Sequence, residues 1–330
     1  MNVLITGHRG YIGCHAVEVF QRAGHSVTGV DIGYFDDCSF GQRTHADIEI
    51  TADVADLSVE QLHGHDAVIH LAAISNDPMG ALDEQLTIRT NFDASMHLAE
   101  LAVAAKVPRF LFSSSCAVYG DSQGQAADED FMTSPQTAYA RSKVAAEQAL
   151  LDMDADGFAV TILRNATAYG YSPALRTDLV FNDFVARLVT DNKVHLLSDG
   201  SACRPLVHCR DIARAFLAVA CADVADMSGT VLNVGDAAQN LKIIELARLV
   251  CASQDGAVLS FEDGVGHDQR DYLVGFSRLS QKLPNYQTNY SLITETEYLL
   301  NKCLERPNFG NEQAVGRYSR LQQLKNELSL

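Results

Sequence analysis

The sequence predicts an α/β fold: a doubly wound, Rossmann-type parallel sheet with a smaller C-terminal lobe. Through the first half, short and nearly continuous apolar runs alternate with helical patterns, which is typical of parallel strands buried on both faces. A glycine-rich turn directly follows the first apolar run, at the end of the strand where such sheets bind ligands. A chain of 330 residues suggests about two units. We place one over residues 1–165 and the second over 166–330, whose strands can cross back to the main sheet.

The expected elements follow in order along the chain. The first half should contain strands at Val3–Ile5, Val27–Val30, Ala67–Leu71, Arg109–Ser113 and Ala159–Leu163, and helices at Ile12–Arg22, Glu84–Ala105 and Thr137–Leu151. The second half should contain a polar loop at Tyr171–Asp178, helices at Leu179–Thr190, Asp211–Cys221 and Leu241–Ala252, and strands at Val194–Leu197 and Thr230–Val234. Residues 308–330 are polar with a late helical pattern, which predicts a helix that docks on the body.

Composition limits the classes of function. The chain carries 25 Lys and Arg against 42 Asp and Glu, a net charge of −17, so general nucleic-acid binding is excluded because it needs a basic surface. The hydrophobic share of 47% is that of a chain that buries a full core. The N-terminus lacks a basic segment followed by a long apolar one, and no run approaches 18 apolar residues, so we expect a cytoplasmic protein without a membrane partner. Eight cysteines without a CxxC pair predict reduced thiols and no metal site.

Three glycines form the clearest motif. Gly7, Gly10 and Gly13 lie between the first strand and the first helix, where the absence of Cβ atoms lets backbone N–H groups approach a pyrophosphate. The helix N-terminus adds a partial positive charge for the anion. Asp31 ends the next strand, 18 positions beyond Gly13, where a carboxylate can accept hydrogen bonds from an adenosine ribose and repel a 2′-phosphate. The motif therefore predicts NAD in preference to NADP; the alternative for Asp31 is a solvated loop acid.

A second motif lies in the predicted helix after the fourth strand. Tyr139 and Lys143 are four residues apart and so share a helix face, where an ammonium beside a phenol should lower the phenol's pKa from about 10 towards the working pH. A run of serines, residues 113–115, ends the strand before it. The alternative is a surface Tyr–Lys pair and a serine turn.

Together these motifs resemble the extended short-chain dehydrogenases/reductases, the nucleotide-sugar epimerase/dehydratase group, over about residues 1–300. The resemblance implies bound NAD, a nucleoside diphosphate sugar as substrate and a homodimer. It implies that the cofactor is contacted by Gly7, Arg9, Gly10, Tyr11, Ile12, Gly13, Asp31, Asp53, Val54, Leu71, Ala72, Ala73, Asn91, Ser113, Tyr139 and Lys143.

The resemblance also implies catalytic roles. Tyr139 would act as the general base on a substrate hydroxyl, Lys143 would hold the phenolate and bond the nicotinamide ribose, and Ser115 would position the reacting oxygen. Substrate contacts are implied or suggested for Ser75, Asn76, Ser115, Asn165, Thr167, Arg204 and Arg270. Guanidinium groups suit diphosphates, although Arg204 and Arg270 would equally serve salt bridges within the lobe, and the segment at Asn76 is also a good turn.

Two departures from the family pattern bear on the reaction. Dehydratases of the group carry an Asp-Glu pair after the catalytic hydroxyl, where this chain has Cys116 and Ala117. Many epimerases place an asparagine where this chain has Thr167. The first departure argues against 4,6-dehydration, and we expect a nucleotide-sugar 4-epimerase that passes through a 4-keto intermediate; the second departure argues against assigning a particular epimerase specificity. A 4-ketoreductase consuming NAD(P)H is the alternative, and a non-catalytic dinucleotide-binding regulator is a third hypothesis.

Overall fold

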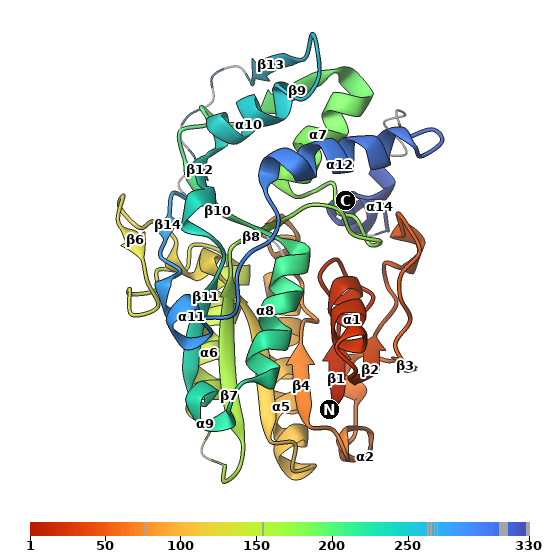
Figure 1. The fold of residues 1–330 in the computed structure, drawn as a ribbon, viewed down its shortest axis with the longest axis vertical. Helices are drawn as coiled ribbons and strands as arrows, with labels where there is room; N and C mark the ends of the chain where they lie inside the picture. The colour runs from red at the N-terminus through yellow and green to blue at the C-terminus, as the bar shows by residue number, and fades with distance from the viewer. Residues whose placement is uncertain are drawn as a thin grey trace.

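The computed structural model describes residues 1–75, 77–153, 155–262, 264, 266, 268, 270–309 and 316–327. Its centre is a seven-stranded sheet in the order β3-β2-β1-β4-β5-β7-β11, with every neighbouring pair parallel (Figure 1). The strands are β1 Asn2–Thr6, β2 Ser26–Asp31, β3 Ile48–Thr51, β4 Ala67–His70, β5 Arg109–Ser115, β7 Ala159–Asn165 and β11 Thr230–Val234. The predicted fold class is confirmed. The order reverses between β1 and β4, which opens a crevice at the carboxyl ends of the strands.

Helices cover both faces of this sheet, as continuous apolar strands require (Figure 1). On one face α1 (Gly13–Arg22) packs against α8 (Cys209–Cys221), and on the other lie α5 (Ala94–Ala104) and α6 (Ala138–Leu151). Alternation along β1 shows why both faces are apolar. Val3 and Ile5 join the core under α1 and α8, whereas Leu4 joins the core under α5 and α6.

The helix expected over residues 84–105 is divided by a π-helical turn. It consists of α4 (Glu84–Ile88), the turn η3 (Arg89–Asp93) and α5. The extra residue in a π-turn changes which side chains face inward, and such turns are frequent near functional sites. Here the turn buries Asn91 completely.

The second half builds a lobe above the carboxyl ends of the main sheet (Figure 1). Small sheets pair β8 (Thr167–Tyr169), β10 (Cys203–His208) and β12 (Asn240–Lys242), then β9 (Lys193–Leu196) with β13 (Val258–Phe261), and β6 (Ala126–Ala127) with β14 (Leu273–Val274). A separate core lies among α7 (Val180–Asp191), α10 (Ile243–Cys251) and α12 (Leu292–Leu304). Helix α12 was not among the expected elements. The remaining helices are α2 Val59–Leu62, α3 Asp77–Gly80, α9 Val224–Met227, α11 Ser277–Lys282 and α14 Arg320–Glu327, with the 3₁₀ turns η1 Asp36–Cys38, η2 Val54–Asp56, η4 Cys116–Tyr119 and η5 Ala237–Gln239.

The C-terminal segment 316–327, which ends in α14, contacts both halves. Tyr318 is buried against Phe40, and its carbonyl accepts a hydrogen bond from the Thr177 N–H at 3.1 Å. The guanidinium of Arg317 donates to the Asp37 carbonyl at 2.8 and 2.9 Å. The segment therefore joins the loop after β2 to the loop before α7.

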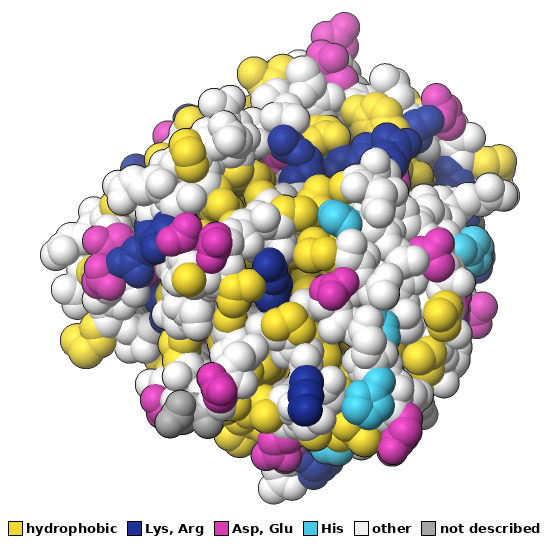
Figure 2. All heavy atoms as spheres, turned by 60° about the horizontal axis from the view of Figure 1, so that its bottom comes forward, with side chains coloured by type: hydrophobic (Ala, Val, Ile, Leu, Met, Phe, Trp, Pro, Cys, Tyr) yellow, Lys and Arg dark blue, Asp and Glu magenta, His cyan; other side chains and the backbone are white. Residues whose placement is uncertain are grey.

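The charges are unevenly distributed on the surface. Figure 2 shows one face, on which Lys and Arg side chains gather in the upper part of the view, while at the left acidic side chains lie beside basic ones. An acidic protein can thus present local positive charge. Among the described helices, none combines the length and apolarity needed to cross a bilayer.

Candidate active site

A cavity of about 1120 Å³ opens at the carboxyl ends of the main strands and continues into the C-terminal lobe. It brings the predicted site residues together from nine separate stretches of chain. Of those the structure describes, all line the cavity except Asn91; Asn76 lies outside the described residues. We call the part near the glycine turn the coenzyme half, and the part near Arg204 and Arg270 the substrate half.

The glycine turn is sterically closed to other residues at two positions. Gly7 has a φ of +69°, and a Cβ there would lie 2.8 Å from the Ala72 nitrogen. A Cβ on Gly13 would lie only 2.0 Å from the Gly7 carbonyl oxygen. The turn is closed by the Gly10 N–H, which donates to the Gly7 carbonyl at 2.9 Å. The backbone at the start of α1 therefore lies bare at the cavity wall, as an approaching pyrophosphate requires.

The end of β2 supplies the carboxylate expected at the ribose. Asp31 accepts the Arg9 N–H at 3.1 Å and the Gly33 N–H at 2.9 Å, so its position is fixed by the turn and by its own loop. The Arg9 guanidinium donates to Thr51 and pairs with Asp36 at 2.8 Å and Glu49 at 3.3 Å. Arg9 thus holds the cavity wall together. Farther along the wall, η2 begins at Val54 and is capped by Asp53, whose carboxylate accepts the Ala55 N–H.

Asn91 does not line the cavity; it contributes by holding the backbone of a loop that does. Its amide oxygen accepts the Ile74 N–H at 2.8 Å, and its amide nitrogen donates to the Ile74 carbonyl at 3.0 Å and to Ser142 at 3.1 Å. Asn91 therefore fixes the loop after β4, which contributes Leu71, Ala72 and Ala73 to the wall.

Helix α6 presents the pair expected to carry the chemistry. The Thr137 hydroxyl caps the helix by accepting the Ala140 N–H at 3.1 Å, which fixes the first turn and places Tyr139 and Lys143 on the cavity side. The Lys143 Nζ donates to the Ser113 carbonyl at 2.7 Å. Burial lowers the pKa of Lys143 to about 7.

The expected lowering of the tyrosine pKa is wrong for this arrangement. Burial raises the pKa of Tyr139 above 10, and a hydrogen bond with Ser115 opposes that rise only in part. The reason is that both partners are buried, so each loses the hydration of its charged form. Removal of the Tyr139 proton must therefore be favoured by what binds in the cavity.

The serine strand is supported from behind by a buried ion pair. Arg164 pairs with Glu147 at 2.7 Å, and the Ser114 hydroxyl donates to the same carboxylate. Next to it, the Asn165 amide nitrogen donates to the Ser113 hydroxyl at 3.0 Å and the Ser114 carbonyl at 3.1 Å. The Asn165 oxygen is buried at the cavity without a hydrogen-bond partner among the described residues, and an unmet acceptor of this kind fits a donor on a ligand.

The two predicted substrate arginines share one carboxylate. Asp268 pairs with Arg204 at 2.7 Å and with Arg270 at 2.9 Å. Arg270 also pairs with Asp77 at 2.9 Å, and the other oxygen of Asp77 accepts the hydroxyl of Thr137, the cap of α6, at 2.6 Å. This chain of contacts links the C-terminal lobe to the catalytic helix.

Arg176 is a cavity residue that the sequence did not single out. It pairs with Asp178 at 2.8 Å and donates to the Ser75 hydroxyl at 2.7 Å. The expected polar loop at 171–178 was the only signal, because an arginine in a loop at the carboxyl end of a sheet is a candidate for ligand contact.

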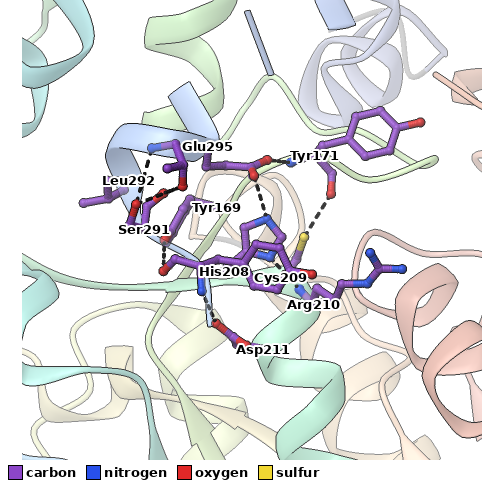
Figure 3. A network of polar contacts seen from close by, with 12 residues as sticks. Tyr169, Tyr171, His208, Cys209, Arg210, Asp211, Ser291, Leu292 and Glu295 are labelled. Carbon is purple, nitrogen blue, oxygen red and sulfur yellow. Dashed lines mark hydrogen bonds and ion pairs between the residues drawn. The ribbon is translucent and has the colours of Figure 1, made fainter. Parts of the chain in front are cut away.

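Figure 3 shows how this loop is anchored. Glu295 of α12 accepts the Tyr171 N–H at 2.6 Å and lies 3.3 Å from the His208 Nε2, while the Cys209 thiol donates to the Tyr171 carbonyl. His208 stacks on Tyr290 with 4.0 Å between ring centroids. The junction of β10 and α8 thereby fixes both the loop with Arg176 and the strand with Arg204.

Comparison with known proteins places this geometry in context. A model of the "NAD dependent epimerase/dehydratase family" matches residues 3–235. A dTDP-glucose 4,6-dehydratase of Streptomyces griseus is 28% identical, over 86% of this chain and 88% of that protein. A Bacillus subtilis (strain 168) protein named "Uncharacterized UDP-glucose epimerase YtcB" is 26% identical, over 91% of this chain and 98% of its own. The structure of MoeE5 with UDP-glucuronic acid and NAD is 25% identical, covers 92% of this chain and 99% of that one, and superposes with a TM-score of 0.79.

The cofactor is NAD, as predicted. The described residues fit it: a turn where Cβ atoms cannot be accommodated, a fixed carboxylate at the end of β2, and an elongated cavity. Among the described residues, no group of three or more His, Cys, Asp or Glu side chains lies close enough to hold a metal ion.

Proposed function

The chain belongs to the NAD dependent epimerase/dehydratase family and is therefore an NAD-dependent enzyme that modifies nucleotide sugars; from this premise we propose that it is a 4-epimerase. In the proposed reaction the sugar is oxidised at C4 to a 4-keto intermediate. The intermediate rotates in the cavity and is then reduced at C4 on its opposite face. NAD, when bound, would supply the chemistry of hydride acceptance from C4 and of hydride donation back to it.

The protein's own residues handle the proton and the sugar. Tyr139 takes the proton of the C4 hydroxyl and later returns it, and the Ser115 hydroxyl, its hydrogen-bond neighbour, donates to the C4 oxygen. Lys143, four residues along α6, stabilises the phenolate while its Nζ stays on the Ser113 carbonyl. Asn165 offers its unmet oxygen to a hydroxyl of the substrate.

The observation that carries the proposal lies beside Ser115. Elimination of water from a sugar needs an acid for the leaving hydroxyl and a base for the neighbouring carbon. At the two positions after Ser115 this chain has Cys116, a buried thiol that donates to the Arg164 carbonyl and whose pKa burial raises, and Ala117, a methyl group at the cavity wall. Neither can fill those roles, so the 4-keto sugar has no route to dehydration at these positions.

The test is product analysis with a panel of UDP- and dTDP-sugars and no added coenzyme. Protein with its copurified NAD should convert a substrate into a product of equal mass with the C4 hydroxyl inverted, followed by NMR. A product lighter by one water would show a dehydratase, and stoichiometric consumption of added NADH would show a ketoreductase; either result overturns the proposal. Absence of turnover on every sugar, with NAD bound, would instead favour a regulator.

A further inference from the structure

One guanidinium in the cavity differs from its neighbours in having no carboxylate partner within the described part of the chain. Six arginines line the described part of the wall, and five of them form ion pairs: Arg9 with Asp36, Arg176 with Asp178, Arg187 with Asp183, and Arg204 and Arg270 with Asp268. The sixth is Arg320, at the start of α14. Among the described residues it makes neither a hydrogen bond nor an ion pair, and its guanidinium lies over the Phe35 ring, 4.8 Å from the centroid.

The position of Arg320 places it at the glycine turn. A Cβ built on Gly10 would lie 4.0 Å from an Arg320 guanidinium nitrogen. Phe35, on which the guanidinium rests, belongs to the loop that follows Asp31 at the end of β2. Arg320 therefore belongs to the coenzyme half of the cavity, whereas Arg204 and Arg270 lie in the substrate half.

The guanidinium of Arg320 keeps its positive charge, and none of the described carboxylates is in contact with it. Burial and the nearby Arg176 lower the pKa of Arg320 to about 10, while Asp178 and Asp31 act in the opposite direction. The group is thus a cation at neutral pH. Five donors arranged in a fork, held beside bare backbone N–H groups, are suited to the oxygens of a diphosphate.

We propose that Arg320, supplied by the C-terminal segment, binds the diphosphate of the coenzyme from the side opposite the glycine turn. The segment is held there by contacts that do not involve the ligand: Tyr318 packs against Phe40, and Arg317 donates to the Asp37 carbonyl. The turn supplies backbone N–H groups and Arg320 supplies the full positive charge that the turn lacks. This assignment rests on NAD as the cofactor and is independent of which sugar reaction follows.

The experiment measures binding to protein freed of nucleotide, by calorimetry, with NAD, ADP-ribose and adenosine as separate probes. Arg320→Gln should weaken NAD and ADP-ribose roughly tenfold to a hundredfold, the range for a hydrogen bond to a charged group, and leave adenosine within about twofold. Lys325→Gln is the matched control, because it removes one charge from the same helix at a residue outside the cavity wall. Equal losses in both variants, or no loss in Arg320→Gln, would overturn the proposal.

Two further arms separate a ligand contact from other causes. Titrations with UDP and dTDP test the other diphosphate that could bind here, that of the nucleotide sugar. If Arg320→Gln lowers the affinity for UDP and dTDP but leaves that for ADP-ribose unchanged, Arg320 serves the substrate and the assignment to the coenzyme is wrong. Arg320→Lys keeps the charge and should recover part of the ADP-ribose affinity. If the lysine variant binds as poorly as the glutamine variant and both unfold at equally reduced temperatures, Arg320 acts by holding the segment in place and the proposal fails.

Discussion

The two halves of the cavity hold their charges differently. In the coenzyme half, Lys143 donates to a backbone carbonyl and Arg320 has no ion-pair partner among the described residues. In the substrate half, Arg204 and Arg270 are both held by Asp268. At Lys143 and Arg320 a ligand anion meets cations without a carboxylate partner among the described residues, whereas at Arg204 and Arg270 it must compete with Asp268. The coenzyme half is therefore preorganised, and we expect tighter binding of NAD than of the sugar nucleotide.

The halves also differ in how far apart their parts lie along the chain. The glycine turn spans seven residues, and the catalytic pair spans five. By contrast, Arg204 meets its carboxylate 64 positions away, and Arg270 meets Asp77 across 193. Local geometry builds the glycine turn and the catalytic pair, whereas tertiary packing builds the substrate half and brings Arg320 to the coenzyme half.

The largest expected effect is on the chemistry between the halves. Tyr139→Phe removes the group that accepts the substrate proton and should reduce turnover roughly 10³-fold, within the range for a general base, with NAD affinity unchanged. Initial rates and NAD titration measure the two effects. Tyr298→Phe, which removes an exposed hydroxyl away from the cavity wall, should behave as wild type. Turnover retained in Tyr139→Phe would show that another residue is the base.

The next largest effect comes from disrupting the glycine turn in the coenzyme half. Gly13→Ala places a methyl group 2.0 Å from the Gly7 carbonyl and 2.7 Å from the His8 Cα, backbone atoms that can move only with the turn. We expect NAD binding to be lost and the free energy of unfolding to fall by about 3 kcal/mol, measured by calorimetry and denaturant titration. In Gly275→Ala the new methyl meets its neighbours at 3.9 and 4.0 Å, so both quantities should stay near wild type. A variant that binds NAD normally would mean that the turn adjusts.

A smaller effect concerns the buried ammonium. The pKa of Lys143 is about 7 in the folded protein against 10.5 ordinarily, so between these values the unfolded chain holds the extra proton and stability rises with pH. Below pH 7 the full cost of burying the charge remains. Lys143→Met should therefore stabilise the nucleotide-free protein by about 2 kcal/mol at pH 6, and less at pH 9, and should also lower turnover. Denaturant titrations at both pH values measure this, and a gain that grows with pH contradicts the lowered pKa.

The smallest effect tests the substrate half. Arg270→Gln removes one of two guanidinium groups at Asp268 and should raise KM for the nucleotide sugar about tenfold with kcat nearly unchanged, since the lost contact is with the diphosphate rather than the reacting carbon. Steady-state kinetics measure both constants. Arg278→Gln, which breaks an ion pair with Asp130 outside the cavity wall, is the control. A drop in kcat instead would indicate that the link through Asp77 to the cap of α6 positions Tyr139.

Much of the fold was predictable because its signals are local. Apolar strands, the positions of α1 and α6, and the family resemblance follow from spacing over a few residues, and the parallel sheet and NAD are confirmed. The division of the helix at residues 84–104 was not predictable, because a π-turn has no distinct sequence pattern. Helix α12 and the contacts of Arg176 were also missed. Both lie in the C-terminal lobe, where short strands and helices follow one another without a regular pattern that the sequence would show.

The sequence by itself determined the glycine turn, the Tyr139–Lys143 pair and the acid at the end of β2, because backbone sterics and helix periodicity fix these at short range. Only the tertiary structure decided which charges remain unpaired. Nothing in the sequence indicates that Arg9 and Arg320 differ in their ion pairing. The fold surrounds Arg9 with carboxylates, whereas it brings Arg320 to the glycine turn from the far end of the chain. Burial likewise reversed the expected shift of the Tyr139 pKa. Desolvation and long-range pairing depend on every element packed around a group, and no local spacing encodes them.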